Sequence, residues 1–322
     1  MARRGLSDPR ADHRPLAVAV MGPTASGKTA FSVEWAERLG TDVISVDSAL
    51  VYRRLDIGSA KPDAATLARA PHRLIDLREP HEPYSAADFA RDARVAMDGL
   101  SAQGRVPLLV GGTGLYFKAL FEGLSELPAS DPAVRAALQR ELAQRGLAAL
   151  HDDLRRLDPV AGARIKPGDT QRTLRALEVQ RISGRTLTDW HAEGKATPTF
   201  PYRVLTLVLA PASREVLHGR IESRFHAMLA AGFLDEVRAL RADPRLHPDL
   251  PAIRAVGYRQ AWAHLDGDTD RAAFVDAGMA ATRHLAKRQL TWLRGLRHAL
   301  WFDPSAERDR LDAVMRGFLG LR

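Results

Sequence analysis

Residues 18–31 are VAVMGPTASGKTAF, an apolar run followed by a glycine-rich loop and the start of an amphipathic segment. Residues 22–29 match the pattern G-x-x-x-x-G-K-[ST] at every position. The apolar run predicts a buried strand, and the segment after the loop predicts a helix. Gly22 and Gly27 allow successive backbone N–H groups to converge on anionic oxygens at the N-terminus of that helix. The stretch therefore predicts a phosphate-binding loop (P-loop) between a strand and a helix.

The side chains of this loop offer several groups to a phosphate. Lys28 adds a point charge, Thr29 offers its hydroxyl to a magnesium ion, and Thr24 and Ser26 supply further donors. The predicted phosphate-binding residues are Gly22, Pro23, Thr24, Ala25, Ser26, Gly27, Lys28 and Thr29. The loop does not identify the molecule that carries the phosphates, and a chance match is the alternative that the strand–loop–helix setting disfavours.

The composition bounds the class of protein. The chain has 322 residues, of which 45% are hydrophobic, enough for one large or two modest globular domains. It contains no cysteine, which excludes disulfides, thiolate zinc sites and a cysteine nucleophile and fits a reducing compartment. No apolar run approaches the roughly eighteen residues of a membrane span. The net charge of +8 favours a polyanionic partner, although an arginine-rich composition also reflects genomic base bias.

Apolar and amphipathic segments alternate beyond the P-loop. The pattern predicts strands at 16–22, 42–48, 71–77, 106–112 and 202–211, and helices at 27–40 and 84–104. Ser85 is the expected N-cap of the second helix, with Asp88 three residues later. This alternation is typical of a parallel sheet with helices on both faces. Residues 128–190 instead show short arginine-rich helical patterns, and helices are expected from 212 to the end.

The expected architecture is therefore a P-loop NTPase-like α/β core that is divided by a mainly helical insertion. We expect a flexible N-terminal extension at 1–15, the first part of the core at 16–127, the insertion at 128–195, and the second part of the core, with basic C-terminal helices, at 196–322.

Two further segments place candidate functional residues at the carboxyl edge of the sheet, where parallel sheets bind ligands. Asp47 and Ser48 follow one predicted strand, and the glycine-rich residues 111–114, which include Thr113, follow another. Asp47 is either a general base or metal-shell carboxylate, or a cap of the next helix. The glycines either allow a ligand to approach the backbone or form a tight turn.

Arginines on predicted helices are candidates for binding phosphates. Arg220 and Arg224 lie four residues apart, so that they either clamp a diphosphate or form ion pairs on a solvated face. A later helix carries a basic rail suited to a phosphate backbone, with a solvated charged face as the alternative. The rail is Arg283, Lys287, Thr291 and Arg294, and the opposite stripe, expected to face a core, includes Leu285, Gln289, Trp292, Leu293 and Leu296.

One segment mixes groups that suit unpaired bases. Residues 253–260 bring Arg254, Tyr258 and Arg259 together, which predicts stacking and hydrogen bonding to RNA.

Taken together, these segments closely resemble the tRNA dimethylallyltransferases, also called tRNA isopentenyltransferases. The resemblance covers residues 16–301 and rests on GPTASGKT (22–29), ISVDSALVYRRLDIGSAKP (44–62), PHRLIDL (71–77), YSAADFARDA (84–93), PLLVGGTGLYFKAL (107–120), LEVQRISGRTLT (177–188), RIESRFHAML (220–229), AVGYRQAW (255–262) and LAKRQLTWLRG (285–295). The absence of cysteine excludes the zinc finger that some eukaryotic members carry. We therefore expect a bacterial, cytoplasmic member that acts as a monomer away from membranes.

The resemblance implies transfer of a dimethylallyl group from dimethylallyl diphosphate to the N6 amine of adenosine 37 of tRNA. It implies catalytic roles for Asp47, which takes the proton of the amine, Thr24, near the bridging oxygen, and Arg224, on the far side of the diphosphate. Mg²⁺ is expected at Thr29 together with the diphosphate. The implied tRNA contacts are Asp47, Ser48, Ala49, Leu50, Thr113, Gln171, Arg172, Thr173, Leu174, Arg175, Arg254, Ala255, Val256, Gly257, Tyr258 and Arg259. The insertion is expected to close over the anticodon stem-loop.

Two alternatives share the P-loop. A nucleotide or metabolite kinase has the same loop and sheet, and a non-catalytic P-loop RNA-binding protein needs no carboxylate at Asp47. The VDSALVY and VGGTGLY pair, the arginine-rich insertion and the basic C-terminal helix favour the transferase.

Overall fold

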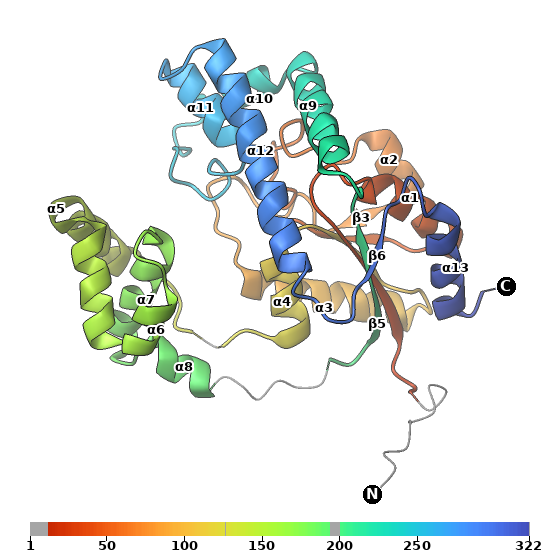
Figure 1. The fold of residues 1–322 in the computed structure, drawn as a ribbon, viewed down its shortest axis with the longest axis horizontal. Coiled ribbons are helices and arrows are strands. Elements are labelled where there is room, and N and C mark those ends of the chain that lie inside the picture. Colours follow the sequence, from red (N-terminus) through yellow and green to blue (C-terminus); the bar gives the residue numbers. More distant parts are fainter. Residues whose placement is uncertain (1–11, 126, 194–199, 322) are drawn as a thin grey trace, which may run out of the picture. The chain divides into compact units, whose positions relative to one another are not determined.

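The computed structural model describes residues 12–125, 127–193 and 200–321. The chain forms two compact units (Figure 1). Unit 1 combines Met1–Phe121 with Phe200–Arg322, and unit 2 is Glu122–Thr199. The expected insertion, 128–195, lies inside unit 2, and most of the expected N-terminal extension lies outside the described residues.

Unit 1 is built on a six-stranded, entirely parallel sheet in the order β3-β2-β4-β1-β5-β6. The strands are β1 (Leu16–Met21), β2 (Val43–Val46), β3 (His72–Arg73), β4 (Leu108–Gly111), β5 (Arg203–Leu209) and β6 (Leu300–Phe302). The prediction of a strand at 71–77 was too long, because Leu74 and Asp76 adopt positive φ and turn the chain away from the sheet. Strand β6 was not predicted, since a three-residue edge strand leaves almost no periodic pattern.

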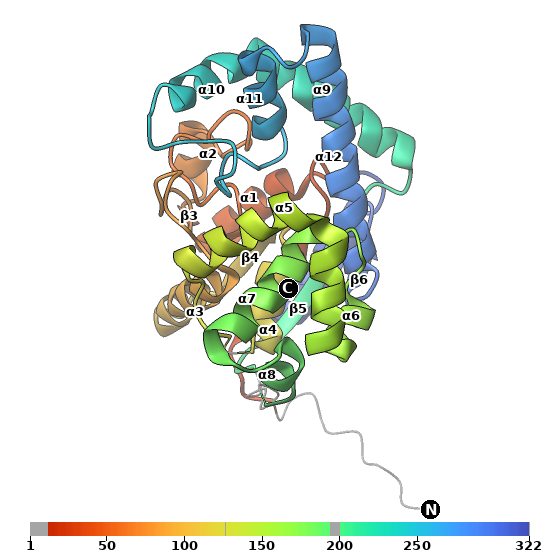
Figure 2. The same cartoon turned by 90° about the vertical axis from the view of Figure 1, so that its left-hand side faces the viewer.

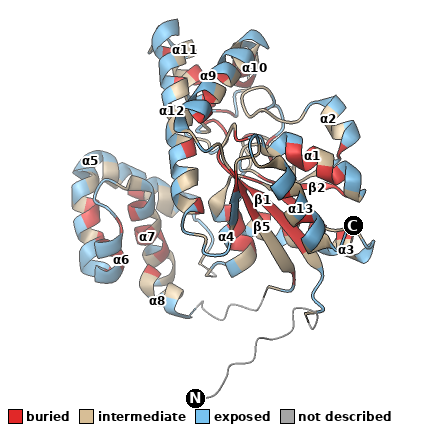
Figure 3. Ribbon diagram, turned by 45° about the vertical axis from the view of Figure 1, so that its right-hand side comes forward, coloured by how far each residue is buried: buried red, intermediate tan, exposed pale blue. Residues whose placement is uncertain are grey.

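Helices cover both faces of this sheet (Figure 1), as the alternating pattern predicted. The helices of unit 1 are α1 (Lys28–Leu39), α2 (Ala64–Arg69), α3 (Ala86–Ala102), α4 (Gly114–Glu122), α9 (Arg214–Ala230), α10 (Phe233–Arg241), α11 (Tyr258–Asp266), α12 (Arg271–Leu293) and α13 (Arg308–Leu319). Ala17, Ala19 and Met21 of β1 pack with α3 and α4, whereas Val18 and Val20 pack with α1 and α13. Both faces are buried, which explains the continuous apolar runs (Figure 3).

A third core lies above the carboxyl edge of the sheet. Side chains of α9, α10, α11 and the first turns of α12 pack there with the loop that follows β2. Phe233 of α10 contacts the ring of Tyr258 edge-on, with 5.2 Å between ring centroids. This core holds the loop after β2 and the segment before α11 on the same side of the sheet.

Unit 2 has a separate apolar core. Its helices are α5 (Pro132–Leu157), α6 (Pro159–Arg164), α7 (Thr170–Ser183) and α8 (Leu187–Glu193) (Figure 2). Helix α5 is interrupted at Gly146, which has a φ of 76°. Leu150 and Leu154 of α5 pack with Leu174 and Leu177 of α7. The helices of unit 2 therefore bury apolar side chains against one another.

The strand register places three loops at one edge of the sheet. Met21 of β1 and Val46 of β2 both pair with Gly111 of β4. The residues that follow these three strands therefore start side by side, at the carboxyl edge. Among the residues described, no helix is both long and apolar enough to span a membrane.

Candidate active site

A cavity of about 840 Å³ lies at the carboxyl edge of the sheet in unit 1. Residues from distant segments line it, among them Thr24, Ala25, Ser26, Gly27, Lys28, Thr29, Asp47, Ser48, Ala49, Leu50, Thr113, Arg220, Arg224, Arg254, Ala255, Val256, Gly257, Tyr258, Leu285 and Gln289. The structure thus brings the predicted P-loop, the segment after β2, the glycine-rich segment after β4 and the two arginines of α9 to one cavity.

The loop of residues 22–29 has the backbone of an anion cradle. Gly27 is the N-cap of α1 and has a φ of 92°, a conformation that glycine adopts without strain. The Oγ of Ser26 is buried and has no hydrogen-bond partner within the described residues, and Thr29 is exposed in the first turn of α1. A buried hydroxyl without a partner is costly unless a ligand satisfies it. Nζ of Lys28 donates a 2.6 Å hydrogen bond to the carbonyl oxygen of Pro23.

The cavity holds positive charge that its burial disfavours. Burial lowers the pKa of Lys28 to about 8. The negative charge of Asp47 opposes this effect, and the positive charge of Arg224 reinforces it. Burial also lowers the pKa of Arg224, again against the influence of Asp47. The two cations and the carboxylate therefore lie within electrostatic reach of one another, and an anion bound among them would stabilise both cations.

Asp47 lines the cavity and also caps the chain at the end of β2. Its Oδ1 accepts a 2.8 Å hydrogen bond from the backbone N–H of Ala49, so the carboxylate does cap the turn after β2. The next residue, Ser48, donates its backbone N–H to Oγ1 of Thr113 at 3.1 Å. These bonds fix the carboxylate at the cavity wall and tie it to the segment after β4.

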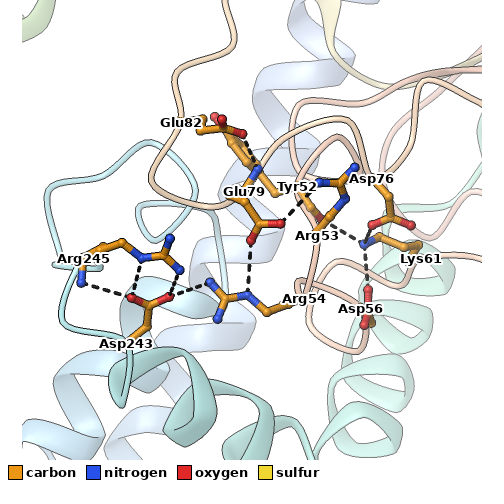
Figure 4. A network of polar contacts seen from close by, with 10 residues as sticks. All are labelled: Tyr52, Arg53, Arg54, Asp56, Lys61, Asp76, Glu79, Glu82, Asp243 and Arg245. Carbon is orange, nitrogen blue, oxygen red and sulfur yellow. Dashed lines mark hydrogen bonds and ion pairs between the residues drawn. The ribbon is translucent and has the colours of Figure 1, made fainter.

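A network of ion pairs holds the loop after β2 in place (Figure 4). Nζ of Lys61, whose side chain is 6% exposed, lies 2.6 Å from the carboxylates of both Asp56 and Asp76. On the other side of the network, Arg54 bonds Asp243 at 2.9 Å and lies 3.6 Å from Glu79. The sequence pattern does not reveal this network, because an irregular loop without periodicity brings its members in residues 52–82 together, and Asp243 comes from a distant segment.

Glu236 of α10 anchors the same loop from another direction. Its carboxylate accepts the backbone N–H groups of Asp56, Ile57 and Gly58 at 2.7–3.2 Å. It also accepts the hydroxyl of Tyr258 at 2.6 Å. Tyr258 is completely buried and its ring packs in the third core, so contact of this residue with tRNA stays a prediction.

The other predicted residues of this segment differ in exposure. Arg254 and Arg259 are exposed, Ala255 and Val256 are half-buried, and Gly257 is buried. Gly257 has a φ of 92° and donates its N–H to Oε1 of Gln260 at 2.9 Å. The two arginines are thus the side chains that this segment offers to a polyanion.

In unit 2, the predicted tRNA-binding residues also divide into two groups. Gln171 and Arg172 are exposed, whereas Thr173 and Leu174 are buried in the unit's core. Arg175 pairs with the carboxylate of Glu178 at 2.9 Å and bonds the carbonyl oxygen of Pro128 at 2.7 Å. The side chains of Thr173 and Leu174 belong to the core, and contact of their segment with tRNA stays a prediction.

Helix α12 carries the predicted basic rail. Lys287 and Arg294 are exposed, and Arg283 lies 3.5 Å from Glu222 of α9. The predicted core stripe is confirmed for Trp292, Leu293 and Leu296, which pack in the core of the sheet, whereas Leu285 lines the cavity. Trp292 stacks on Phe117 with 6.3 Å between ring centroids. Arg283 thus follows the alternative of a paired surface arginine.

Gln289 lies on this stripe and was assigned to the core, but the structure places it in the cavity wall. Its Oε1 accepts the backbone N–H of Thr24 at 2.9 Å, and its Nε2 donates to the carbonyl oxygen of Gly112 at 3.1 Å. A single polar residue in an apolar stripe is the signal that could have identified it.

The chain also matches known proteins. The family model described as IPP transferase matches residues 50–296. A tRNA dimethylallyltransferase of Xanthomonas campestris pv. campestris is 58% identical over 317 residues, which are 97% of each chain. One from Stenotrophomonas maltophilia is 58% identical over 96% of this chain and 98% of its own. The chain belongs to the tRNA dimethylallyltransferase family.

Solved structures agree with this membership of the tRNA dimethylallyltransferase family. The tRNA isopentenylpyrophosphate transferase of Bacillus halodurans is 36% identical, with a TM-score of 0.69 over 95% of this chain and 96% of that chain. A eukaryotic dimethylallyltransferase acting on tRNA shares the fold, with a TM-score of 0.78 over 95% of this chain and 80% of that chain, at 23% identity.

Proposed function

We propose that the unit 1 cavity binds dimethylallyl diphosphate, and that the chain, which as a family member transfers a dimethylallyl group to tRNA, places that group on the N6 amine of adenosine 37. The observation that carries this proposal is the cavity itself, in which the half-buried side chains of Lys28 and Arg224 place positive charge beside the carboxylate of Asp47. Such a site fits an anionic leaving group on one side and an amine that loses a proton on the other.

The donor side is supported by the geometry of the P-loop. The backbone N–H groups of Gly27, Lys28 and Thr29 at the start of α1, the buried hydroxyl of Ser26 and the ammonium of Lys28 all suit a diphosphate. Arg224 lines the same cavity from α9, on a different element. We assign Thr24 to the oxygen that bridges the diphosphate and the allylic carbon, because it lines the cavity beside these groups.

Magnesium fits this arrangement as a companion of the diphosphate. Within the described residues, no cluster of His, Cys, Asp and Glu could hold a metal ion by itself. The exposed hydroxyl of Thr29, in the first turn of α1, is the group we assign to Mg²⁺. When bound, Mg²⁺ would neutralise negative charge on the departing diphosphate.

Asp47 is assigned to the amine of adenosine. In the reaction the bond between N6 and the allylic carbon forms, the bond between that carbon and the diphosphate oxygen breaks, and the N6 proton passes to the Asp47 carboxylate. The amine is a poor nucleophile, so its position against the allylic carbon contributes more than the basicity of the carboxylate. The hydrogen bond from Ala49 holds this carboxylate in place.

The tRNA contacts are proposals from the exposed residues of the predicted set. Arg254 and Arg259 of unit 1 and Arg172 and Gln171 of unit 2 present polar side chains to solvent. Adenosine 37 is stacked inside its loop, and flipping it costs a few kcal/mol, which phosphate contacts offset. We propose that unit 2 closes over the anticodon stem-loop when tRNA binds, and that the protein acts as a cytoplasmic monomer.

The test uses purified protein, Mg²⁺, radiolabelled dimethylallyl diphosphate and unmodified tRNA with adenosines at 36–38. The labelled nucleoside is identified after digestion, and a tRNA with guanosine at 37 is the matched control. Label in N6-dimethylallyladenosine from the first tRNA alone supports the proposal. Absence of label, with ATP hydrolysed or a phosphate moved to a small acceptor, would favour the kinase alternative. Binding of tRNA that does not depend on the donor, without transfer, would favour the RNA-binding alternative.

A further inference from the structure

Gln289 joins the P-loop, which the proposed function assigns to the donor, to the segment after β4. That segment is bonded through Thr113 to the turn that carries Asp47. The side-chain amide of Gln289 accepts from the N–H of Thr24, in the P-loop, and donates to the carbonyl of Gly112, which follows β4. We propose that Gln289 is a positioning residue, which sets the distance between the diphosphate loop and the acceptor edge of the cavity. The inference rests on the proposed function.

The chemistry of the two partners requires an amide. A backbone N–H needs an acceptor and a backbone carbonyl needs a donor, so the orientation of the Gln289 amide is determined by its partners. Glutamate would satisfy Thr24 alone, leucine would satisfy neither, and asparagine is shorter by one methylene. Only the glutamine side chain therefore serves both loops from this position on α12.

The segment after β4 leaves room for the Gln289 side chain. A Cβ atom at position 112 would lie 2.3 Å from Nε2 of Gln289, so glycine allows the amide to approach. The residue after Gly112 is Thr113, whose Oγ1 accepts the N–H of Ser48, the neighbour of Asp47. A continuous path of bonds thus runs from the P-loop through Gln289 and Gly112 to the turn that carries the catalytic carboxylate.

The P-loop is held by the same helices at a second point. Ala25, with a φ of 61°, packs against the apolar cluster of Leu217 and Ile221 from α9 and Ala286 from α12. Helix α9 also carries Arg224. The helices that hold the tip of the loop therefore also carry the arginine on the far side of the cavity, and Gln289 adds the polar link.

In the P-loop, one group bonds Gln289 and another is left for the diphosphate. The N–H of Thr24 is taken by Gln289 and is not offered to the diphosphate, whereas the buried hydroxyl of Ser26 has no partner in the described residues. Loss of Gln289 would free the Thr24 N–H and the Gly112 carbonyl together. Both loops would then be free to shift relative to each other, although no group that the proposed function assigns to a substrate is removed.

The experiment compares Gln289→Leu and Gln289→Glu with the wild type. The matched control is Gln103→Leu: Gln103 is an exposed residue that follows α3, and its side chain accepts one hydrogen bond from Arg105 at 3.2 Å. Thermal unfolding, kcat, and KM for dimethylallyl diphosphate and for tRNA are measured for each variant. We expect Gln289→Leu to lower kcat/KM for the donor about 10- to 30-fold, the effect of two neutral hydrogen bonds, with KM for tRNA unchanged.

Gln289→Glu adds a signature that general loosening of the fold does not produce. Its ionised carboxylate cannot donate to Gly112 and lies near the diphosphate, so its deficit at about pH 8 should equal or exceed that of Gln289→Leu. An ordinary glutamate has a pKa of about 4.3 and stays ionised between about pH 6 and 8, so this deficit should persist across that range although Gln289→Glu keeps the acceptor for Thr24.

Three outcomes would overturn the inference. They are unchanged donor kinetics in Gln289→Leu, a fall in kcat with both KM values unchanged and a matching loss of folded protein, and wild-type donor kinetics in Gln289→Glu. Failure of the wild-type protein to transfer the group would refute the proposed function instead, so the two failures are distinguishable.

Discussion

Glu178 in unit 2 and the cavity cations Lys28 and Arg224 in unit 1 differ in whether the protein itself supplies hydrogen-bonded partners of opposite charge. In unit 2, burial alone raises the pKa of the Glu178 carboxyl, but hydrogen bonds from Ser130 and Arg175 outweigh burial and hold that pKa below its usual range. Arg135 contributes a further ion pair at 3.4 Å. In unit 1, burial is the largest influence on Lys28 and Arg224 and lowers the pKa of both.

The difference shows how to tell a structural charge from a functional one. The charge of Glu178 is neutralised by its own protein, so it stabilises the fold. The charges of Lys28 and Arg224 are held in a cavity at a cost, which a bound anion would offset. Variants at the sheet edge should therefore affect activity without affecting folding, and variants around Glu178 should do the reverse.

The largest effect is expected from Asp47→Asn. Loss of a general base typically costs about 10²- to 10⁴-fold in rate, and the isosteric amide keeps an oxygen for the N–H of Ala49. Single-turnover transfer should fall by that factor, while tRNA affinity and the thermal midpoint stay near wild type. Normal turnover would remove Asp47 from the mechanism.

Glu178→Ala should produce the largest loss of stability. Removing one partner of a buried ion pair costs about 3–5 kcal/mol, because the arginines keep their charge in a partly buried site. Chemical denaturation of the full chain checks this, with Glu141→Ala, at a more exposed ion pair with Arg181, as the control. The folded pKa of Glu178 lies below its unfolded value, so its stabilisation is present above the unfolded pKa and is lost as the pH falls through the folded pKa. A stable variant with impaired donor binding would break the contrast between the units.

Arg224→Met should weaken donor use without weakening the fold. Loss of one group that stabilises a developing anion costs about 10²- to 10³-fold in kcat/KM for dimethylallyl diphosphate. The thermal midpoint should stay the same or rise, since a buried charge is replaced by an apolar chain of similar length. A defect confined to tRNA binding would show that Arg224 serves the other substrate.

Lys28 should give donor binding a dependence on pH. Its pKa is about 8 in the ligand-free protein, and a diphosphate favours its charged form, so KM for the donor should stay constant below about pH 8 and rise above it. The folded pKa lies below the usual 10.5, so this group also makes the free energy of unfolding increase between those pH values. In Lys28→Met the donor KM should be higher and flat across that range, and a flat wild-type profile would mean that the charge of Lys28 does not contribute.

The smallest effect is expected at the basic rail. Lys287 is exposed on α12, so Lys287→Ala should weaken tRNA binding only a few-fold and lower the slope of log affinity against log salt by about 1 if it contacts a phosphate. Titrations at several salt concentrations measure the slope, with Arg310→Ala, in an ion pair on α13, as the control. An unchanged slope would assign Lys287 to an ordinary solvated face.

Local patterns were sufficient for much of the fold and for part of the site. The strand, loop and helix of residues 16–39, the capping box at Ser85 and Asp88, and the buried alternation of β1 follow from neighbouring residues, and the structure has them. The strands at 43–46 and 108–111 placed Asp47 and Thr113 at one edge, because parallel strands end on the same side of a sheet. The sequence by itself therefore determined the α/β class, the strand, loop and helix of residues 16–39, and the family.

Only the tertiary structure decided which of the polar residues face the cavity. Tyr258 and Arg259 are adjacent, yet one is buried against Glu236 and the other is exposed. Gln289 lies in an apolar stripe but bonds two loops more than 170 residues away. The burial and partners of such side chains depend on long-range packing, which local periodicity does not contain. The physical reason is that the hydrogen-bond partners and the burial of a charged or amide side chain are set by its neighbours in space. Those neighbours come from distant segments and meet only when the chain folds.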